Sequence, residues 1–183
     1  MIIFDLDGTL ADCEHRRHFV DPEKNENYCR YNGNDFRGYK NGQIQLDVKL
    51  KPDWDAFYEA CDKDTPIQPL IYIWNLYEVD LALERIDLQI WSGRSQSVRE
   101  KTEKWLDMYL TGFDPKQLKM RPIGDYTPDD QLKERWLDEQ YEETKWGRKH
   151  HIDFVFDDRP KVIRMWKRHS IFVFNCNQKE GEF

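Results

Sequence analysis

The chain has 183 residues, which is enough for one domain with a full core and an insertion, and too few for two separate domains of ordinary size. Charged residues make up 34% of it and the net charge is −7, which disfavours broad adhesion to a polyanion but leaves room for binding one nucleotide or one strand end. No apolar run reaches the length of a membrane span and no basic-then-apolar leader opens the chain, so we expect a cytoplasmic protein without membrane contact.

The opening stretch predicts a buried strand that ends in two carboxylates. Residues 2–4 are β-branched or aromatic, and Asp5 and Asp7 follow one residue apart before Gly8 turns the chain. Alternation along a strand places both aspartates on one side, where they repel each other unless a cation or a proton lies between them. Because Mg²⁺ prefers oxygen ligands and is often held by carboxylates and a substrate phosphate, the pair indicates a magnesium and phosphate site. One carboxylate can then act as nucleophile and the other as acid and base.

Residues 11–67 show neither strand nor helix periodicity, and residues 21–51 are rich in Asn, Gly, Asp and Lys. This composition predicts a loop-rich or small β insertion. Two interpretations of its interleaved aromatic residues are open: they stack on a nucleobase, or they form a minor apolar cluster that holds the insertion together. These residues are Tyr28, Tyr31, Phe36 and Tyr39. Arg16 can reach a phosphate with two hydrogen bonds, although an arginine in a His-Arg-Arg-His string is by itself more typical of a solvated face.

The next elements are two helices and a strand. One helix is expected to begin at Pro52 and another to cover about residues 69–84, because apolar residues recur there every three or four positions. Residues 86–91 then predict a short strand, and the string Ser-Gly-Arg-Ser at residues 92–95 ends it. A helix is expected over about residues 96–109, directly after the Ser92 hydroxyl at the end of a parallel strand. The hydroxyl and the free amides of the helix N-terminus predict a phosphate-binding site.

A third strand is expected at residues 118–121, followed by a loop and by a helix that begins near Asp129. Asp129 and Lys133 are four residues apart and therefore share one face of this helix. Two interpretations are open for them. They form an ordinary surface ion pair, or Asp129 aims Lys133 at a phosphate.

The last predicted strands are residues 151–156 and 171–174, with a helix between them. The first of these strands ends in Asp157 and Asp158, and Pro160 is suited to the first turn of the helix that follows. The two carboxylates at a strand end can supply the remaining ligands of a metal ion.

Four motifs therefore occur in one order at strand or helix ends: DLDGT at 5–9, WSGR at 91–94, DDQLK at 129–133 and FDDRP at 156–160. Together they resemble the motifs of the haloacid dehalogenase superfamily of aspartate-nucleophile phosphatases. In detail the chain is similar to the 3′-phosphatase domain of phage polynucleotide kinase-phosphatases and to related stand-alone phage and bacterial phosphatases, over nearly its whole length except about residues 21–49. The resemblance implies an α/β fold with a Rossmann-like parallel sheet flanked by helices. It also implies a single domain over residues 1–183, with a cap inserted after the first strand at about residues 12–66.

The resemblance implies a role for each motif residue. Asp5 would be the nucleophile that becomes an aspartyl-phosphate, Asp7 the acid and base, and Lys133 the third catalytic residue. A Mg²⁺ ion would be held by Asp5, by the backbone carbonyl of Asp7 and by Asp157, with Asp158 in an outer or a shared role. Contacts with the phosphate or the substrate are implied for Ser92, Gly93, Arg94, Arg16, Asp129 and Arg159.

The implied activity is that of a Mg²⁺-dependent phosphomonoesterase that acts on a nucleic-acid 3′-phosphate end. A 5′-nucleotidase for (deoxy)nucleoside monophosphates is the alternative, indicated by the acidic net charge and by the missing kinase half. A kinase would need the string GxxxxGK[ST], and the nearest one, at residues 33–40, lacks the Gly-Lys-Ser/Thr ending. A non-catalytic binding module is a third hypothesis. If the chain is phage-encoded, the expected cytoplasm is that of the host cell.

Overall fold

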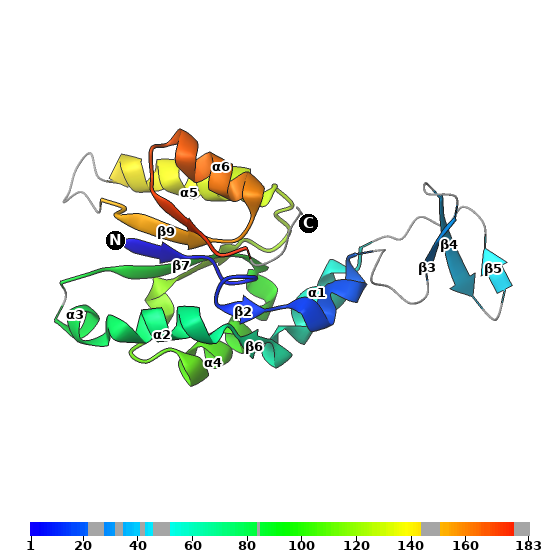
Figure 1. Cartoon of the computed structure of the whole chain (residues 1–183), viewed down its shortest axis with the longest axis horizontal. Helices are drawn as coiled ribbons and strands as arrows, with labels where there is room; N and C mark the ends of the chain where they lie inside the picture. Colours follow the sequence, from blue (N-terminus) through cyan, green and yellow to red (C-terminus); the bar gives the residue numbers. More distant parts are fainter. Residues whose placement is uncertain are drawn as a thin grey trace. The chain divides into compact units, whose positions relative to one another are not determined.

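The computed structural model describes residues 1–21, 28–31, 35–40, 43–45, 52–83, 85–143 and 151–177 (Figure 1). Of these, residues 28–45, 78 and 141–143 are described by their backbone alone. The chain divides into two compact units, which are described separately: Met1–Asp12 together with Thr65–Phe183, and Cys13–Asp64. No helix within the described residues is long and apolar enough to cross a membrane.

The first unit is built on a five-stranded sheet with β1 (Ile2–Phe4) at its centre. The strand order is β10 (Val173–Asn175), β9 (Phe154–Asp157), β1, β7 (Leu88–Ser95) and β8 (Leu118–Arg121), and all neighbours are parallel. From β1 the chain builds β7 and β8 on one side and then returns to build β9 and β10 on the other. In open parallel sheets, ligands bind outside the carboxyl ends of the strands at such a reversal of strand order. The topology therefore predicts a site beside the end of β1.

Helices cover both faces of this sheet (Figure 1). One face carries α5 (Asp129–Glu143) and α6 (Pro160–Arg168), and the other carries α2 (Gln68–Leu76), α3 (Glu78–Ala82) and α4 (Arg99–Tyr109). The smaller elements of the unit are the antiparallel pair β2 (Ala11–Asp12) and β6 (Thr65–Pro66), and the short 3₁₀ helices η4 (Gln96–Val98) and η5 (Pro115–Gln117).

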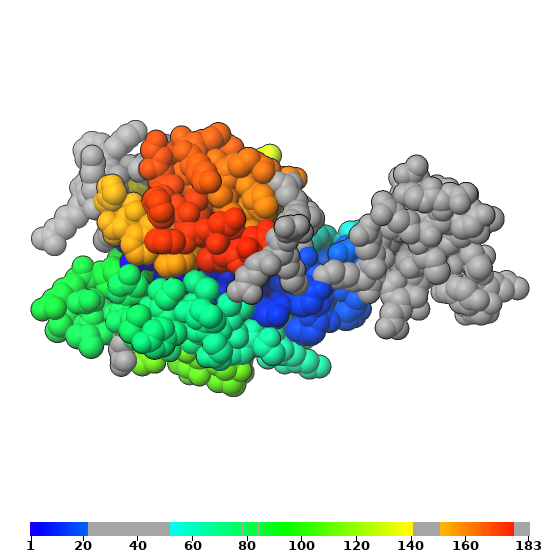
Figure 2. Space-filling view, viewed as in Figure 1, coloured from blue at the N-terminus to red at the C-terminus, as the bar shows by residue number. Residues whose placement is uncertain are grey.

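Successive strand residues pack against opposite helical layers. Ile3 and Trp91 belong to a cluster with apolar residues of α5 and α6, in which Trp91 and Trp136 meet edge to face at 5.8 Å between ring centroids. Phe4 faces the other layer and contacts Trp74 of α2 at 5.4 Å. On the face of the molecule that Figure 2 shows, the segments of α2 to α4 and of β9 to β10 form most of the surface, and little of β1 is visible between them. Because both faces of β1 are buried, its sequence is apolar throughout rather than alternating.

The second unit contains η1 (Glu14–Phe19), α1 (Trp54–Glu59) and η3 (Ala60–Lys63). It also contains a three-stranded antiparallel sheet of β3 (Tyr28–Tyr31), β4 (Asp35–Lys40) and β5 (Gln43–Gln45), in keeping with the small β insertion expected here. The side chains of the interleaved aromatic residues, Tyr28, Tyr31, Phe36 and Tyr39, lie outside the described ones. The choice between base stacking and an apolar cluster therefore stays open.

Several predicted boundaries differ from the structure. The single helix expected over residues 69–84 is two helices, because Tyr77 ends α2 and precedes α3. The strand expected to end at residue 91 continues to Ser95, with an irregular register against β8 between Ser92 and Ser95. This irregularity places the second motif inside a strand rather than in the turn after it. The strand expected at 151–156 is β9, which begins three residues later.

Candidate active site

Three neighbouring strands bring residues of three motifs together near the carboxyl ends of β1 and β9. Asp5 directly follows β1, Ser92 lies in β7, and Asp157 ends β9. Because β1 pairs with both β7 and β9, these positions lie side by side. Asp5, Asp157 and Asp158 are at most 5% exposed, so their carboxylates are largely removed from bulk water. The first, second and fourth motifs thus meet at one edge of the sheet.

The turn after β1 requires a glycine. Gly8 has a φ of +90°, which side chains with a Cβ atom rarely adopt. A Cβ atom on Gly8 would lie only 2.1 Å from Oδ2 of Asp158. The glycine therefore lets the first loop turn and lets the fourth motif approach the first.

Three carboxylates share a small buried volume. Asp5, Asp157 and Asp158 each offer one oxygen, and these atoms lie within 4.8 Å of one another. Burial raises the pKa of Asp5 well above its ordinary value; Lys133 lowers it, and the charges of Asp157 and Asp158 raise it further. Burial and the charge of Asp157 likewise raise the pKa of Asp158 to about 6. A cation among the three carboxylates would favour their ionised forms.

Lys133 supplies one positive charge to this cluster from the first turns of α5. Its ammonium donates hydrogen bonds to Oδ1 of Asp5 at 2.6 Å and to Oδ2 of Asp157 at 2.8 Å. Burial lowers the pKa of Lys133, but the charges of Asp157 and Asp5 outweigh burial and raise the pKa above its ordinary value. Asp157 is further fixed by the backbone amide of Arg159 at 3.1 Å and by the indole N–H of Trp166 at 3.4 Å. Lys133 is therefore a fixed cation between two motif carboxylates.

The expected pairing of Asp129 with Lys133 is wrong. The carboxylate of Asp129 accepts hydrogen bonds from the guanidinium groups of Arg121 and Arg159, one on each oxygen. The spacing of four residues does place both side chains on one helix face, but the arginines approach Asp129 from the ends of β8 and β9. The side chain of Arg159 is 34% exposed, whereas Lys133 on α5 is almost fully buried. The implied substrate contacts of Asp129 and Arg159 stay predictions.

Arg121 is a residue of the site that the sequence analysis missed. Its Nε donates to the carbonyl of Gly93 at 2.8 Å, while another nitrogen binds Asp129. Its Nη1 donates to the carbonyls of Thr127 at 2.5 Å and Asp125 at 3.2 Å. Arg121 thus joins the second motif, the third motif and the loop after β8. The available signal was its position at the carboxyl end of a predicted parallel strand.

In the second motif, Arg94 binds Asp7, the candidate acid and base. Ser92 is fully buried, and its Oγ accepts a hydrogen bond from the backbone amide of Arg94 at 3.2 Å. Nε and Nη2 of Arg94 donate to Oδ1 of Asp7 at 2.9 and 2.5 Å. The irregular register of β7 turns Arg94 toward the loop after β1, as bulges do beside many active sites. Contacts of Ser92 and Arg94 with a phosphate stay predictions.

Gly93 is tightly packed against the third motif, and its replacement gives a first testable prediction. A Cβ atom on Gly93 would lie 2.7 Å from Oδ1 of Asp129, which two arginines hold in place. We expect Gly93→Ala to lower the free energy of unfolding by about 1–3 kcal/mol in chemical denaturation, the usual cost of overpacking. The same change in an Asp129→Ala background should cost less, because the opposing oxygen is gone. Equal costs in the two backgrounds would contradict this packing argument.

Arg16 lies in the second unit and has a partner there that the sequence analysis did not identify. Its Nε and Nη2 each donate to a carboxylate oxygen of Asp64 at 2.7 Å, and its Nη1 donates to the carbonyl of Phe57 at 3.1 Å. The guanidinium also lies 4.1 Å from the centre of the Phe57 ring, and the side chain is fully buried. Arg16 is thus not part of a solvated face. Its contact with a substrate phosphate stays a prediction.

The residues present fit a hard divalent cation. Oδ1 of Asp158 is buried and accepts no hydrogen bond from the part of the chain that the structure describes, although buried polar atoms normally have a partner. The cluster of Asp5, Asp157 and Asp158 offers carboxylate oxygens alone, which suits Mg²⁺ better than a softer metal. The carboxylate of Asp7 is not in this cluster, and ligation through its backbone carbonyl stays a prediction.

Comparisons with known proteins agree with this arrangement. Residues 53–183 match the family described as the polynucleotide kinase PNKP phosphatase domain. A protein of Autographa californica nuclear polyhedrosis virus, named as a bifunctional polynucleotide kinase/RNA ligase, is 39% identical over 95 residues. The match covers 50% of this chain but only 12% of that relative.

Solved structures share the fold at low sequence identity. Two chains from the Pnkp1/Rnl/Hen1 RNA repair complex match 98% of this chain with TM-scores of 0.58 and 0.62, at 22% and 23% identity. This chain covers 43% and 46% of their lengths. A class C acid phosphatase from Bacillus anthracis matches 97% of this chain, which covers 67% of that protein, with a TM-score of 0.53 and 13% identity.

These likenesses confirm two expectations from the sequence. The α/β sheet flanked by helices is shared with the solved structures, and the matching family model places it in the haloacid dehalogenase group. The family match covers well over half of the chain and includes the second, third and fourth motifs. The chain therefore belongs to the family of PNKP phosphatase domains.

Proposed function

We propose that the chain is a Mg²⁺-dependent 3′-phosphatase that removes phosphate from polynucleotide ends through an aspartyl-phosphate on Asp5. The observation that carries the proposal is the position of Asp5: at the carboxyl end of the central strand, buried, with Lys133 at 2.6 Å and two further carboxylates beside it. The preference for a polynucleotide end is supported by the relatives, which are named for polynucleotide kinase or for RNA repair.

In the first step a carboxylate oxygen of Asp5 attacks phosphorus, and the bond from phosphorus to the leaving 3′-oxygen breaks. Asp7 gives its proton to that oxygen, so the strand leaves as a neutral alcohol. Arg94 orients Asp7 for this transfer through the two hydrogen bonds to Oδ1. Lys133, already on Asp5, offsets the negative charge that gathers around phosphorus in the transition state.

In the second step a water molecule attacks the phosphorus of the aspartyl-phosphate, and the bond to the Asp5 oxygen breaks. Asp7, now ionised, takes the proton of this water and so returns to its starting form. Ser92 and the amides near it are proposed to hold the remaining phosphate oxygens during both steps. The low exposure of the site keeps other water away from the intermediate.

Asp5, Asp157 and Asp158 would hold the metal ion, together with the backbone carbonyl of Asp7. When bound, Mg²⁺ supplies positive charge that draws the phosphate against Asp5 and stabilises its oxygens. We propose in addition that the second unit, Cys13–Asp64, is the cap of the enzyme and takes part in choosing the substrate.

A 5′-nucleotidase is the second candidate, and the net charge of −7 favours it, because an acidic protein gains little from a long polyanion. The deciding experiment measures phosphate release in Mg²⁺ buffer from a 3′-phosphorylated DNA strand and from a panel of 5′-mononucleotides. We expect preference for the strand, a rate that falls as salt rises, and loss of release with EDTA that Mg²⁺ restores. A preference for mononucleotides that salt hardly changes would establish the nucleotidase instead.

A further inference from the structure

A groove runs along β8, the edge strand of the sheet, between α4 and α5. Its volume is about 610 Å³, and its lining follows β8 from Lys116 just before the strand to Pro122 just after it. Residues from the starts of η4 and α4 and from the middle of α5 line it as well. The groove therefore runs beside the outer strand of the sheet and reaches the loop that follows β8. This loop begins at the carboxyl end of β8, on the same side of the sheet as the motif residues.

The charge of this groove is opposite to that of the whole chain. Four basic residues line it against two acidic ones, in a protein whose net charge is −7. The basic residues are Arg99, Lys116, Lys119 and Arg135, and the acidic ones are Asp125 and Glu139. Lys116 is exposed and makes no ion pair within the described residues. Lys119 pairs with Glu139 at 2.8 Å, Arg135 with Asp125 at 2.5 Å and Arg99 with Glu103 at 2.7 Å. The groove lining thus keeps a net positive charge on an otherwise acidic protein, and Lys116 is the basic residue in it that a phosphate can reach without displacing a carboxylate.

The loop at the end of the groove is held firmly to the active site. Nη1 of Arg121 binds the carbonyls of Asp125 and Thr127, and the same guanidinium binds Asp129. The carboxylate of Asp125 accepts hydrogen bonds from the amide of Thr127 at 2.8 Å and from Arg135 at 2.5 Å. These bonds fix the backbone on both sides of residue 126.

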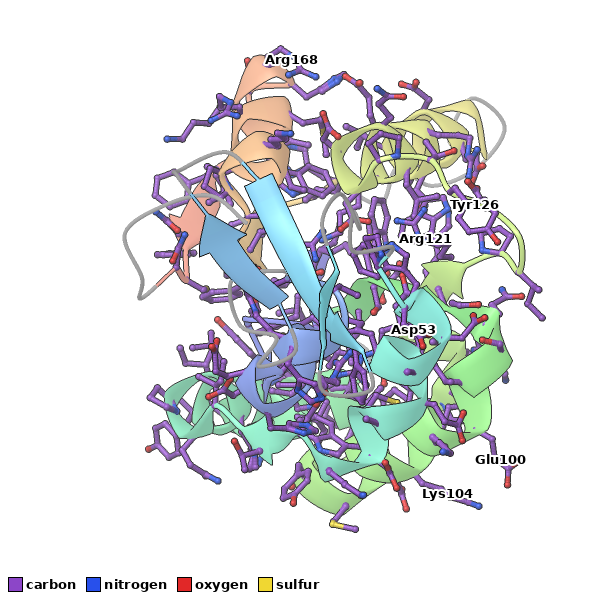
Figure 3. All side chains as sticks on the ribbon, turned by 90° about the vertical axis from the view of Figure 1, so that its right-hand side faces the viewer. Asp53, Glu100, Lys104, Arg121, Tyr126 and Arg168 are labelled. Carbon is purple, nitrogen blue, oxygen red and sulfur yellow. The ribbon has the colours of Figure 1, made fainter. Side chains whose placement is uncertain are left out.

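Tyr126 is the residue that this fixed loop presents to solvent. It is 88% exposed, which is unusual for an aromatic side chain on a loop so firmly tied (Figure 3). Ile123 of the same loop is 72% exposed. An exposed aromatic ring on a rigid support is suited to stacking, because little conformational freedom is lost when a flat partner binds.

We propose that Tyr126 and the groove along β8 form a track for a single polynucleotide strand whose 3′-phosphate lies in the active site. Tyr126 stacks on a base near that end, and Lys116, Lys119 and Arg135 contact the phosphates of the nucleotides that follow toward the 5′ end. The track rests on the proposed phosphatase function and deepens it, since it makes the enzyme prefer strands to single nucleotides.

The first test measures how activity depends on strand length. Substrates are a nucleoside 3′-phosphate and 3′-phosphorylated DNA strands of two, four and eight nucleotides. For the wild type we expect kcat/KM to rise with length, and Tyr126→Ala should lower the ratio between the eight-nucleotide strand and the nucleoside by about 5- to 100-fold, the effect of one stacked base. Tyr126→Phe should keep the ratio. Tyr72→Ala is the matched control, because Tyr72 is also an exposed tyrosine, 65% exposed, on α2.

A second test measures binding apart from catalysis. The probe is a fluorescein-labelled eight-nucleotide DNA strand without a 3′-phosphate, and its fluorescence anisotropy gives Kd. Tyr126→Ala should weaken binding by a similar factor, and Lys116→Gln should reduce the slope of log Kd against log salt by about 0.7, as expected for one lost phosphate contact. Lys104→Gln is the control, since Lys104 is exposed on α4 and absent from the groove lining (Figure 3).

The outcomes separate this inference from the proposed function. If the wild type cleaves strands but Tyr126→Ala changes neither the length dependence nor Kd, the track is wrong and the phosphatase proposal stands. If no phosphate is released but the strand binds and Tyr126→Ala weakens it, the track stands and the phosphatase proposal fails. If the bound strand protects neither Lys116 nor Lys119 from chemical acetylation, the track is wrong.

Discussion

Asp5→Asn is expected to abolish turnover while leaving the protein folded. The asparagine keeps the shape of the side chain and can still accept the hydrogen bond from Lys133, but its amide oxygen is a far weaker nucleophile than a carboxylate. Loss of the covalent route should lower kcat by about 10³-fold or more, which corresponds to about 4 kcal/mol or more in activation free energy. Steady-state phosphate release from the 3′-phosphorylated strand measures the loss.

The same variant distinguishes a missing nucleophile from a damaged fold. Because burial raises the pKa of Asp5 well above its ordinary value, a neutral residue there relieves repulsion among the carboxylates, and we expect Tm to stay equal or to rise in metal-free buffer. Acid quenching after mixing with a ³²P-labelled 3′-phosphate strand should leave label on the wild type and none on Asp5→Asn. Asp107→Asn, on the exposed side of α4, is the matched control. Turnover within about tenfold of the wild type would contradict the role of Asp5.

The parts of the site that the sequence predicted are those that depend on local chemistry and on strand ends. Asp5 and Asp157 each follow or end a short apolar run, and runs of that kind are buried parallel strands. Parallel strands have their carboxyl ends at one edge, so the motifs had to meet there once the α/β alternation was recognised. The approach of Gly8 to Asp158 follows from the same topology.

The parts that the sequence did not predict depend on which charged partners the tertiary fold brings to a side chain. Helical spacing placed Asp129 and Lys133 on one face, but it carried no information on the arginines that come from the ends of β8 and β9. Arg16 and Asp64 are 48 residues apart, and their pairing crosses a segment without any periodic pattern. Such ion pairs are set by tertiary packing, so a local pattern indicates the charge of a residue and not its partner.

The pairing of Arg16 also changes how its predicted role is understood. A guanidinium that already binds both oxygens of a buried carboxylate and lies over an aromatic ring is fixed in orientation. Leaving Asp64 buried without this partner would be costly, so loss of Arg16 should damage the second unit whether or not it also touches a phosphate. An activity loss in an Arg16 variant therefore carries information on catalysis only beside a measurement of its stability.

Lys133→Met is expected to have the largest effect on stability. Lys133 is 2% exposed, and its ammonium offsets the charges of Asp5 and Asp157, so the methionine fills the space but leaves buried carboxylates without their cation. Breaking a buried pair in this way typically costs about 3–5 kcal/mol in the free energy of unfolding. Activity should be lost as well, because the charge that stabilises the transition state is gone. Urea denaturation of metal-free protein measures the stability.

The pH dependence of this loss tests its electrostatic origin. The pKa of Asp5 is already raised, and that of Asp158 is raised to about 6, and without Lys133 both should rise further. A carboxyl group whose folded pKa exceeds its unfolded pKa stabilises the fold fully below the unfolded value, near 4, and loses that contribution as pH rises through the folded value. The difference in the free energy of unfolding between Lys133→Met and the wild type should therefore be larger at pH 8 than at pH 5, and Mg²⁺ should recover part of it at pH 8.

Lys104→Met, at an exposed lysine of α4, should show almost no difference from the wild type at either pH. A loss for Lys133→Met that is equal at both pH values would mean that packing, rather than charge, explains the role of Lys133.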